Sequence, residues 1–114
     1  MTRRYVLTLD LKNDPHLIAE YRRYHGSVWP EINASLKSSG IDDAEIYLLG
    51  TRMFMILEVN EGFSWERKLN SDRENPVVEK WEALMSKFQQ PLPEAKAGEK
   101  WLLMERIYKM PDGN

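Results

Sequence analysis

The order of strand-like and helix-like patterns along the chain constrains its fold more than any other feature of the sequence. Alternating apolar residues, which are typical of strands, occur at 5–11, 41–49, 52–59 and 100–110. Apolar residues at helical spacing occur at 15–26, at about 27–38, at 63–69 and at 77–88. With adjoining helical segments taken together, the order is β-α-β-β-α-β, the split βαβ arrangement of ferredoxin-like α+β domains. We therefore expect one four-stranded antiparallel sheet with helices over one of its faces.

Prolines and glycines set the expected helix boundaries. Asp14 and the proline after it predict the start of the first helix, because aspartate caps free backbone N–H groups and proline suits the first helical position. Gly26 predicts the end of this helix. Pro30 is best tolerated in the first turn of a second helix, so that helix is expected to begin close to Gly26 or Ser27. His25 would then lie beside a break between two helices.

The third strand segment predicts a second apolar surface. Met53, Met55 and Leu57 alternate with Phe54 and Ile56, so both faces of this strand are apolar. Helices can cover only one of the two faces, and a monomer would expose the other. We therefore expect a homodimer that buries sheet against sheet and so forms a dimeric α/β barrel.

The length, composition and charge fit a single globular domain. We expect one domain over 1–114, because 42% of the 114 residues are hydrophobic and 30% are charged, with a frayed tail at 111–114. The formal net charge of −2 argues against a nucleic-acid partner. The N-terminal sequence lacks an apolar signal core, and no long apolar stretch follows, so we expect a cytoplasmic protein without a membrane partner.

Several kinds of chemistry are poorly supported by the sequence. It has no cysteine, no glycine-rich phosphate loop and no pair of histidines at metal-ligand spacing. We therefore expect neither phosphate transfer nor a metal site.

The two histidines differ in what their surroundings predict. His16 falls in the first turn of the first helix and is expected to face solvent. His25 follows Tyr21 by four residues and lies at the expected helix end, where the helix dipole favours an imidazolium. A histidine there could act as a general acid near neutral pH. Spacing alone equally allows His25 and Tyr21 to be hydrogen-bonded packing residues.

The chain is also rich in tryptophan, and indole rings are good platforms for the apolar faces of sugars. Trp81 could line such a site, or it could fill the core. Its neighbour Glu82 could contact a ligand, although a solvated helix face is the more common role. Arg22 and Arg23 are expected on solvated helix surface.

One segment resembles a known family. Tyr21, three further residues, His25 and then Trp29-Pro30-Glu31 form a motif similar to that of the L-rhamnose mutarotase family, and the resemblance covers nearly the whole chain. It implies a ferredoxin-like homodimer that converts one anomer of a sugar into the other without a cofactor. It also implies that Tyr21 contacts the sugar, that His25 donates a proton and that Trp81 lines the sugar pocket.

Two departures from the rhamnose type bear on the substrate. That type has a tyrosine at the position of Ala44 and a second tryptophan at that of Glu82, which we expect to contact the sugar here. Other segments resemble the L-fucose mutarotase branch; they lie at 61–68, 88–93 and 98–106. We therefore expect the substrate to be a 6-deoxy-hexose, with L-fucose preferred over L-rhamnose. The matching base remains open among Glu82, Glu105 and Asp10.

The fold itself leaves other functions open. Ferredoxin-like dimers also include cofactor-independent monooxygenases and haem-degrading enzymes, which use a similar cleft between helices and sheet. A non-catalytic sugar-binding dimer is a further alternative. Anomer exchange separates these classes from a mutarotase.

Overall fold

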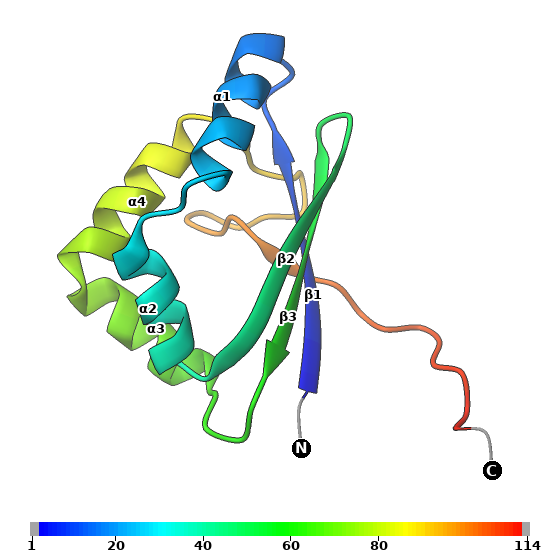
Figure 1. The fold of residues 1–114 in the computed structure, drawn as a ribbon. Helices are drawn as coiled ribbons and strands as arrows, with labels where there is room; N and C mark the ends of the chain where they lie inside the picture. Colours follow the sequence, from blue (N-terminus) through cyan, green and yellow to red (C-terminus); the bar gives the residue numbers. More distant parts are fainter. Residues whose placement is uncertain (1–2, 113–114) are drawn as a thin grey trace.

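A computed structural model describes residues 3–112 and places the helices over one face of an antiparallel sheet (Figure 1). The elements, in chain order, are β1 (Arg3–Leu11), α1 (Pro15–His25), α2 (Pro30–Ser38), β2 (Ile41–Leu49), β3 (Arg52–Val59), α3 (Trp65–Glu74), α4 (Pro76–Ser86), β4 (Gln89–Gln90) and β5 (Leu102–Leu103). The α+β class and the antiparallel sheet are therefore confirmed.

The strands lie in the order β2-β3-β1-β4. Strand β5 also pairs with β1, on the same side of β1 as β4. Two two-residue strands thus take the place of the single final strand predicted over 100–110, and that prediction is wrong in length. The backbone N–H of Met104 donates to the carbonyl of Val6 at 2.8 Å. Beyond this bond the chain leaves the sheet (Figure 1), and residues 104–112 form no regular element. An alternating pattern cannot form a strand where no neighbouring strand is available to pair with it.

The sheet is open, so the expectation of a barrel is not met by this chain. β2 lies at one edge, whereas β4 and β5 lie toward the other edge beside β1, and these two edges do not meet. The predicted tail at 111–114 falls partly outside the described residues. Residues 111–112 are exposed and lack regular structure.

Helix α1 begins and ends where the sequence predicts. The Asp14 carboxylate accepts hydrogen bonds from the backbone N–H groups of His16 and Leu17, and the helix ends at His25 with Gly26 as its C-cap. The prediction that the next helix begins near Gly26 or Ser27 is wrong, because α2 begins at Pro30 itself. A residue before proline is biased toward extended backbone, and Trp29 has a ψ of 134°.

The helical spacing at 77–88 corresponds to α4, which runs over Pro76–Ser86 and starts directly after Asn75. The Asn75 side chain accepts from the backbone N–H groups of Val77 and Val78 and so caps α4. The preceding helix, predicted over 63–69, instead runs from Trp65 to Glu74, with Ser64 as its cap. Among residues 3–112, no helix has the length and apolar character needed to cross a membrane.

Two apolar clusters join the helices to the sheet. The larger has Leu9, Leu11 and Met53 of the sheet against Tyr21, Ile32, Val78, Trp81, Met85 and Phe88. The smaller consists of Leu7, Ile41, Leu57, Val59 and Phe63. In β2 only Ile41 is buried. The helices therefore cover β1 and β3 but leave most of β2 uncovered.

Candidate active site

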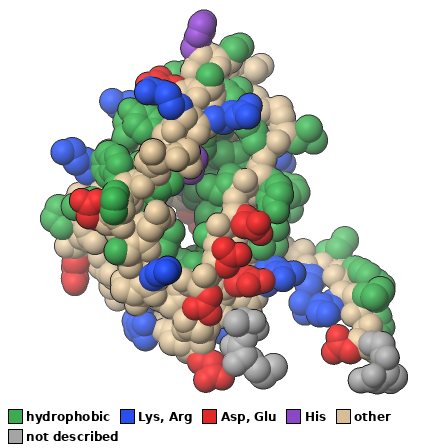
Figure 2. All heavy atoms as spheres, viewed as in Figure 1, with side chains coloured by type: hydrophobic (Ala, Val, Ile, Leu, Met, Phe, Trp, Pro, Cys, Tyr) green, Lys and Arg blue, Asp and Glu red, His purple; other side chains and the backbone are tan. Residues whose placement is uncertain are grey.

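A cavity of about 520 Å³ lies between α1 and the β2–β3 hairpin. Figure 2 shows the molecule hollowed between the helix layer and these strands. The cavity is lined by Tyr21, Arg22, His25, Gly26, Ile46, Tyr47, Leu48 and Met53. It thus combines one wall of polar side chains from α1 with one wall that is mainly apolar.

The apolar wall follows from the register of the hairpin. Ile46 pairs with Met55 and Leu48 pairs with Met53, whose side chain is buried in the core. Paired residues share a face of the sheet, so Ile46 and Leu48 lie on the face that carries the helices. They nevertheless remain 39% and 36% exposed. No helix packs on them, and the uncovered space is the cavity.

His25 is the last residue of α1 and is half-buried. Its Nδ1 lies 2.9 Å from the backbone carbonyl oxygen of Tyr21. A carbonyl can only accept, so Nδ1 carries a hydrogen and donates it. This bond leaves Nε2 as the nitrogen that can gain or lose a proton. His16, in contrast, is exposed, as predicted.

Tyr21 lies beside His25, with ring centroids 4.4 Å apart, and is 4% exposed. Its hydroxyl oxygen accepts a hydrogen bond from Nε2 of Gln89 at 3.2 Å. Burial raises the pKa of Tyr21 to about 12; the hydrogen bond from Gln89 opposes this rise and the charge of Glu82 adds to it. The phenol therefore keeps its proton at neutral pH.

Trp81 is a second aromatic neighbour of the histidine. Its ring lies 5.8 Å from that of His25 and meets it edge to face, and its side chain is buried in the core. The ring of Trp29 packs against Trp81 in turn, at 4.9 Å between centroids. Trp81 therefore contacts the histidine while filling the core, and it is not among the residues that line the cavity.

Glu82 is placed differently from the other predicted site residues. Its carboxylate forms an ion pair with Lys100 at 2.7 Å, and its side chain is partly exposed. It is not among the residues that line the cavity. The structure thus brings Tyr21, His25 and Trp81 together but leaves Glu82 outside this group.

The other two candidate bases also lie away from the cavity lining. Asp10 alternates with the buried Leu9 and Leu11, so it lies on the sheet face opposite the helices, where it pairs with Arg52. Glu105 is exposed in the segment after β5. None of the residues that line the cavity therefore has a carboxylate side chain.

Three features of the site were not predicted from the sequence. Arg22 is exposed, as expected for helix surface, but it also lines the cavity. Leu48 lines the cavity although its pattern indicates an ordinary strand. Gln89 is buried beneath Tyr21. The only available signal was the alternation that places Leu48 on the same face as Met53.

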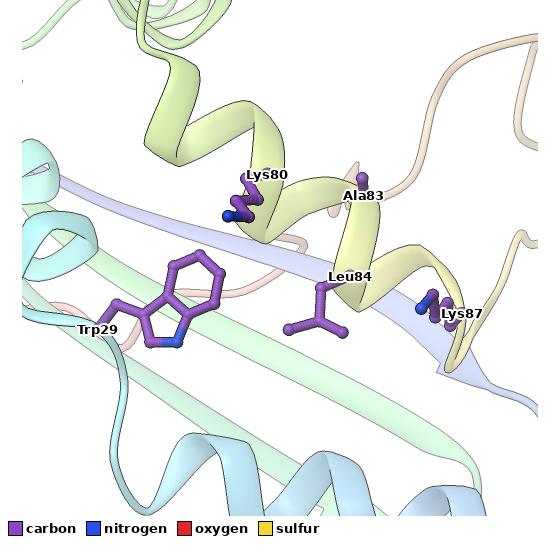
Figure 3. Close-up of a pocket in the computed structure, with 5 residues that line it drawn as sticks. All are labelled: Trp29, Lys80, Ala83, Leu84 and Lys87. Carbon is purple, nitrogen blue, oxygen red and sulfur yellow. The ribbon is translucent and has the colours of Figure 1, made fainter.

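A second, smaller pocket of about 320 Å³ lies between α4 and the side chain of Trp29, the residue before α2 (Figure 3). Figure 3 shows the indole of Trp29 beside α4 side chains that include Lys80 and Leu84. Neither histidine lines this pocket, so it is separate from the candidate site.

The described part of the chain contains no group of three or more His, Asp or Glu side chains able to hold a metal ion. The expectation that no metal or cofactor is required stays a prediction.

Comparisons of the sequence with known proteins identify one family. A family model described as L-rhamnose mutarotase matches residues 4–110. An L-fucose mutarotase from Xanthomonas campestris is 40% identical over 111 residues, which cover 96% of this chain and 89% of that protein. An L-rhamnose mutarotase from Acidiphilium cryptum is 30% identical over 100 residues, covering 86% and 90% of the two chains.

A solved structure supports the fold independently. The crystal structure of an L-rhamnose mutarotase from Formosa agariphila aligns with a TM-score of 0.71 and covers 96% of this chain and 99% of that one. Its sequence identity is only 20%, so this likeness concerns the fold. From the family model and the two sequence relatives, the chain belongs to the L-rhamnose mutarotase family, whose enzymes are isomerases that interconvert sugar anomers.

Proposed function

We propose that this protein interconverts the α and β anomers of a 6-deoxy-hexose, with L-fucose as its preferred sugar. The observation that carries the proposal is His25, whose Nδ1 is held by the Tyr21 carbonyl while its ring borders a cavity large enough for a monosaccharide. The relative named an L-fucose mutarotase is more similar in sequence than the L-rhamnose mutarotase compared above. The cytoplasmic location expected from the N-terminal sequence is part of this proposal.

Anomer exchange requires two proton movements. The ring oxygen gains a proton as the bond from the ring oxygen to the anomeric carbon breaks, and the anomeric hydroxyl loses one. The free aldehyde then rotates, and the ring closes on the opposite face of the aldehyde carbon. Protonated His25 supplies the first proton from Nε2, and a positioned acid of this kind contributes about 10²- to 10⁴-fold to the rate.

The proton acceptor is less directly indicated by the chain. None of the carboxylates of Asp10, Glu82 and Glu105 lines the cavity. We infer that water in the open cavity takes the anomeric proton, and that neutral His25 recovers a proton when the ring closes. The two steps then balance, since one proton leaves the sugar and one enters it in each direction.

The apolar wall suits a deoxy sugar. Ile46, Leu48 and Met53 line the cavity opposite the polar side chains of α1. A methyl group can be buried against such a wall, whereas a hydroxymethyl group would lose hydrogen bonds to water there. This wall supports a 6-deoxy-hexose over its parent hexose.

We further propose that the active form is a homodimer. The sheet face opposite the helices exposes Phe54 and its paired residue Tyr47, which also borders the cavity at the edge strand β2. The segment after β5 exposes Ile107, Tyr108 and Met110. These apolar side chains have no partner helix in the described chain, and a second copy would cover both surfaces at once. The extended segment 104–112 projects away from its own sheet (Figure 1), which suits contact with that second copy.

Saturation-transfer NMR of sugar anomers tests the proposed activity. The unmodified protein is mixed with L-fucose, L-rhamnose, D-ribose or D-galactose, and anomer exchange is compared with buffer alone. We expect the largest acceleration with L-fucose. Faster exchange of L-rhamnose would retain the mutarotase assignment but contradict the substrate. No acceleration of any sugar would contradict the assignment itself.

A further inference from the structure

Gln89 and Tyr21 form a buried polar pair beneath the candidate site. Gln89 is 5% exposed and Tyr21 is 4% exposed. Gln89 lies in β4, where it pairs with Leu11 of the central strand β1, and it follows directly after the buried Phe88. Its backbone is thus held by the sheet, and its side chain reaches the Tyr21 hydroxyl from outside α1.

The direction of the hydrogen bond between them has a chemical consequence. Nε2 of an amide can only donate, so the Tyr21 oxygen is the acceptor in the 3.2 Å contact. The hydroxyl hydrogen of Tyr21 is then not used by Gln89. In the opposite arrangement, the hydroxyl would donate to the amide oxygen and have no hydrogen left for another partner.

The amide oxygen of Gln89 is a second buried polar atom at this position. Oε1 is buried and has no hydrogen-bond partner among the described residues. Buried polar atoms are rarely left unpaired, and those that are often belong to functional sites. The pair therefore keeps the Tyr21 hydroxyl able to donate while leaving another buried polar atom without a partner.

We propose that Gln89 is a positioning residue that makes the Tyr21 hydroxyl a hydrogen-bond donor to an oxygen of the bound sugar. The inference rests on the proposed mutarotase function. Gln89 itself does not line the cavity and acts through Tyr21, which is among the residues that do. The partner that the hydroxyl recognises is a sugar oxygen bearing lone pairs, such as the ring oxygen or a ring hydroxyl.

The protonation state of Tyr21 allows its hydroxyl group to donate a hydrogen bond. Burial raises the pKa of its phenol to about 12, so the proton is present throughout the neutral range. The neighbouring ring of His25 lies 4.4 Å away between centroids. A sugar oxygen held by the tyrosine is thus held beside the histidine.

Two substitutions of Gln89 separate positioning from packing. Gln89→Met retains a similar length but removes the donor. Gln89→Glu retains the shape, and its ionised carboxylate accepts from the Tyr21 hydroxyl, which reverses the bond. We expect each variant to lose about tenfold or more in kcat/KM for anomer exchange, as for the loss of one hydrogen bond.

The pH profile gives a readout that packing alone would not produce. A protonated carboxyl can donate to Tyr21 again, so Gln89→Glu should regain activity relative to the unmodified protein as the pH is lowered. Gln89→Met should show no such recovery. Circular dichroism and urea unfolding check that both variants are folded under the assay conditions.

A double-variant cycle completes the test. In a Tyr21→Phe background, Gln89→Met should change kcat/KM by less than twofold, because the hydroxyl that it positions is already absent. Equal losses in both backgrounds would overturn the proposal, as would full activity of Gln89→Met. If the unmodified protein exchanges no sugar, the proposed function fails and this inference fails with it. Exchange by the unmodified protein without loss in the variants contradicts only the role of Gln89.

Discussion

Lys100 and Glu82 join the loop before β5 to helix α4. The Lys100 ammonium lies 2.7 Å from the Glu82 carboxylate and also donates to the Glu82 carbonyl and the Ser86 hydroxyl, at 3.2 and 3.1 Å. The resemblance to the rhamnose type places a tryptophan at the position of Glu82. An indole there could not form this ion pair, so the attachment of the loop in this chain depends on the glutamate at position 82.

Replacing Ala44 and Glu82, the two residues that differ from the rhamnose type, should change the sugar preference. Ala44 lies on the inner face of β2, two residues before Ile46 of the cavity wall. Together, Ala44→Tyr and Glu82→Trp should shift the ratio of kcat/KM for L-rhamnose over L-fucose upward by about tenfold, because they restore the two aromatic residues that the resemblance assigns to the rhamnose type. Anomer-exchange NMR with both sugars measures the ratio.

The control for this change is Lys100→Met, which removes the ion pair but adds no ring. We expect Lys100→Met to reduce exchange of both sugars to a similar extent and to leave their ratio within about twofold. The same shift in Lys100→Met and in the double variant would mean that loop attachment, rather than aromatic contact, determines the preference.

The second prediction concerns the two histidines. His25→Ala should reduce anomer exchange by about 10²- to 10⁴-fold, because it removes the proposed proton donor. His16→Ala is the matched control, since His16 is exposed on the same helix and has no contact with the cavity. Exchange rates are measured by NMR after circular dichroism has shown that both variants are folded. An unchanged rate in His25→Ala would contradict the assigned role.

The parts of the fold that depend on local sequence were predictable. Asp14, Asn75 and Gly50 act within a few residues of themselves, as caps or in a turn, so the starts of α1 and α4 and the hairpin could be predicted. The final strand could not be, because alternation at 100–110 indicates that residues suit a strand and does not indicate whether a neighbouring edge extends far enough to pair with them.

In the candidate site, too, contacts between residues close in the sequence were predictable and contacts between distant residues were not. Tyr21 and His25 lie one helical turn apart, so their proximity follows from the sequence. Trp81 and Gln89 reach them from distant parts of the chain; the sequence alone left Trp81 open between a sugar site and the core, and it gave no indication of Gln89. The cavity exists because α1 does not cover Leu48, which depends on how helices and sheet pack as a whole. No short sequence pattern predicts whether α1 covers Leu48.

The third prediction uses the raised pKa of Tyr21. In the unfolded chain the phenol ionises near pH 10, whereas burial raises its folded pKa to about 12. The folded state therefore binds this proton more tightly, and the resulting stability is fully present below pH 10 and is lost as pH rises to 12. Urea unfolding should show a fall of about 2–3 kcal/mol between pH 10 and pH 12.

Tyr21→Phe separates this effect from the titration of lysines, which both proteins share. The difference in unfolding free energy between the unmodified protein and Tyr21→Phe should be constant from pH 7 to 9.5 and should fall above pH 10. A difference that stays constant up to pH 12 would show that the phenol ionises alike in the folded and unfolded states.

The fourth prediction tests the apolar wall. Leu48→Ala enlarges the cavity opposite the polar side chains, so it should favour L-galactose, which carries a hydroxymethyl group where L-fucose carries a methyl. We expect the preference for L-fucose to fall by about tenfold. Leu49→Ala is the control, because Leu49 is 85% exposed and points to the other face of the same strand. A similar fall in both variants would contradict the wall assignment.

The fifth prediction tests the proposed homodimer. Size-exclusion chromatography with light scattering should give a dimer for the full chain. Deletion of residues 104–114 should give a monomer, because it removes the exposed Ile107, Tyr108 and Met110, and unpaired apolar surface of this kind drives association. Deletion of residues 111–114 alone should leave the dimer intact and serves as the length control.

A dimer that survives the longer deletion would place the interface on the open sheet face around Phe54, and Phe54→Glu in the truncated chain should then separate the subunits. A monomeric full chain would contradict the homodimer itself.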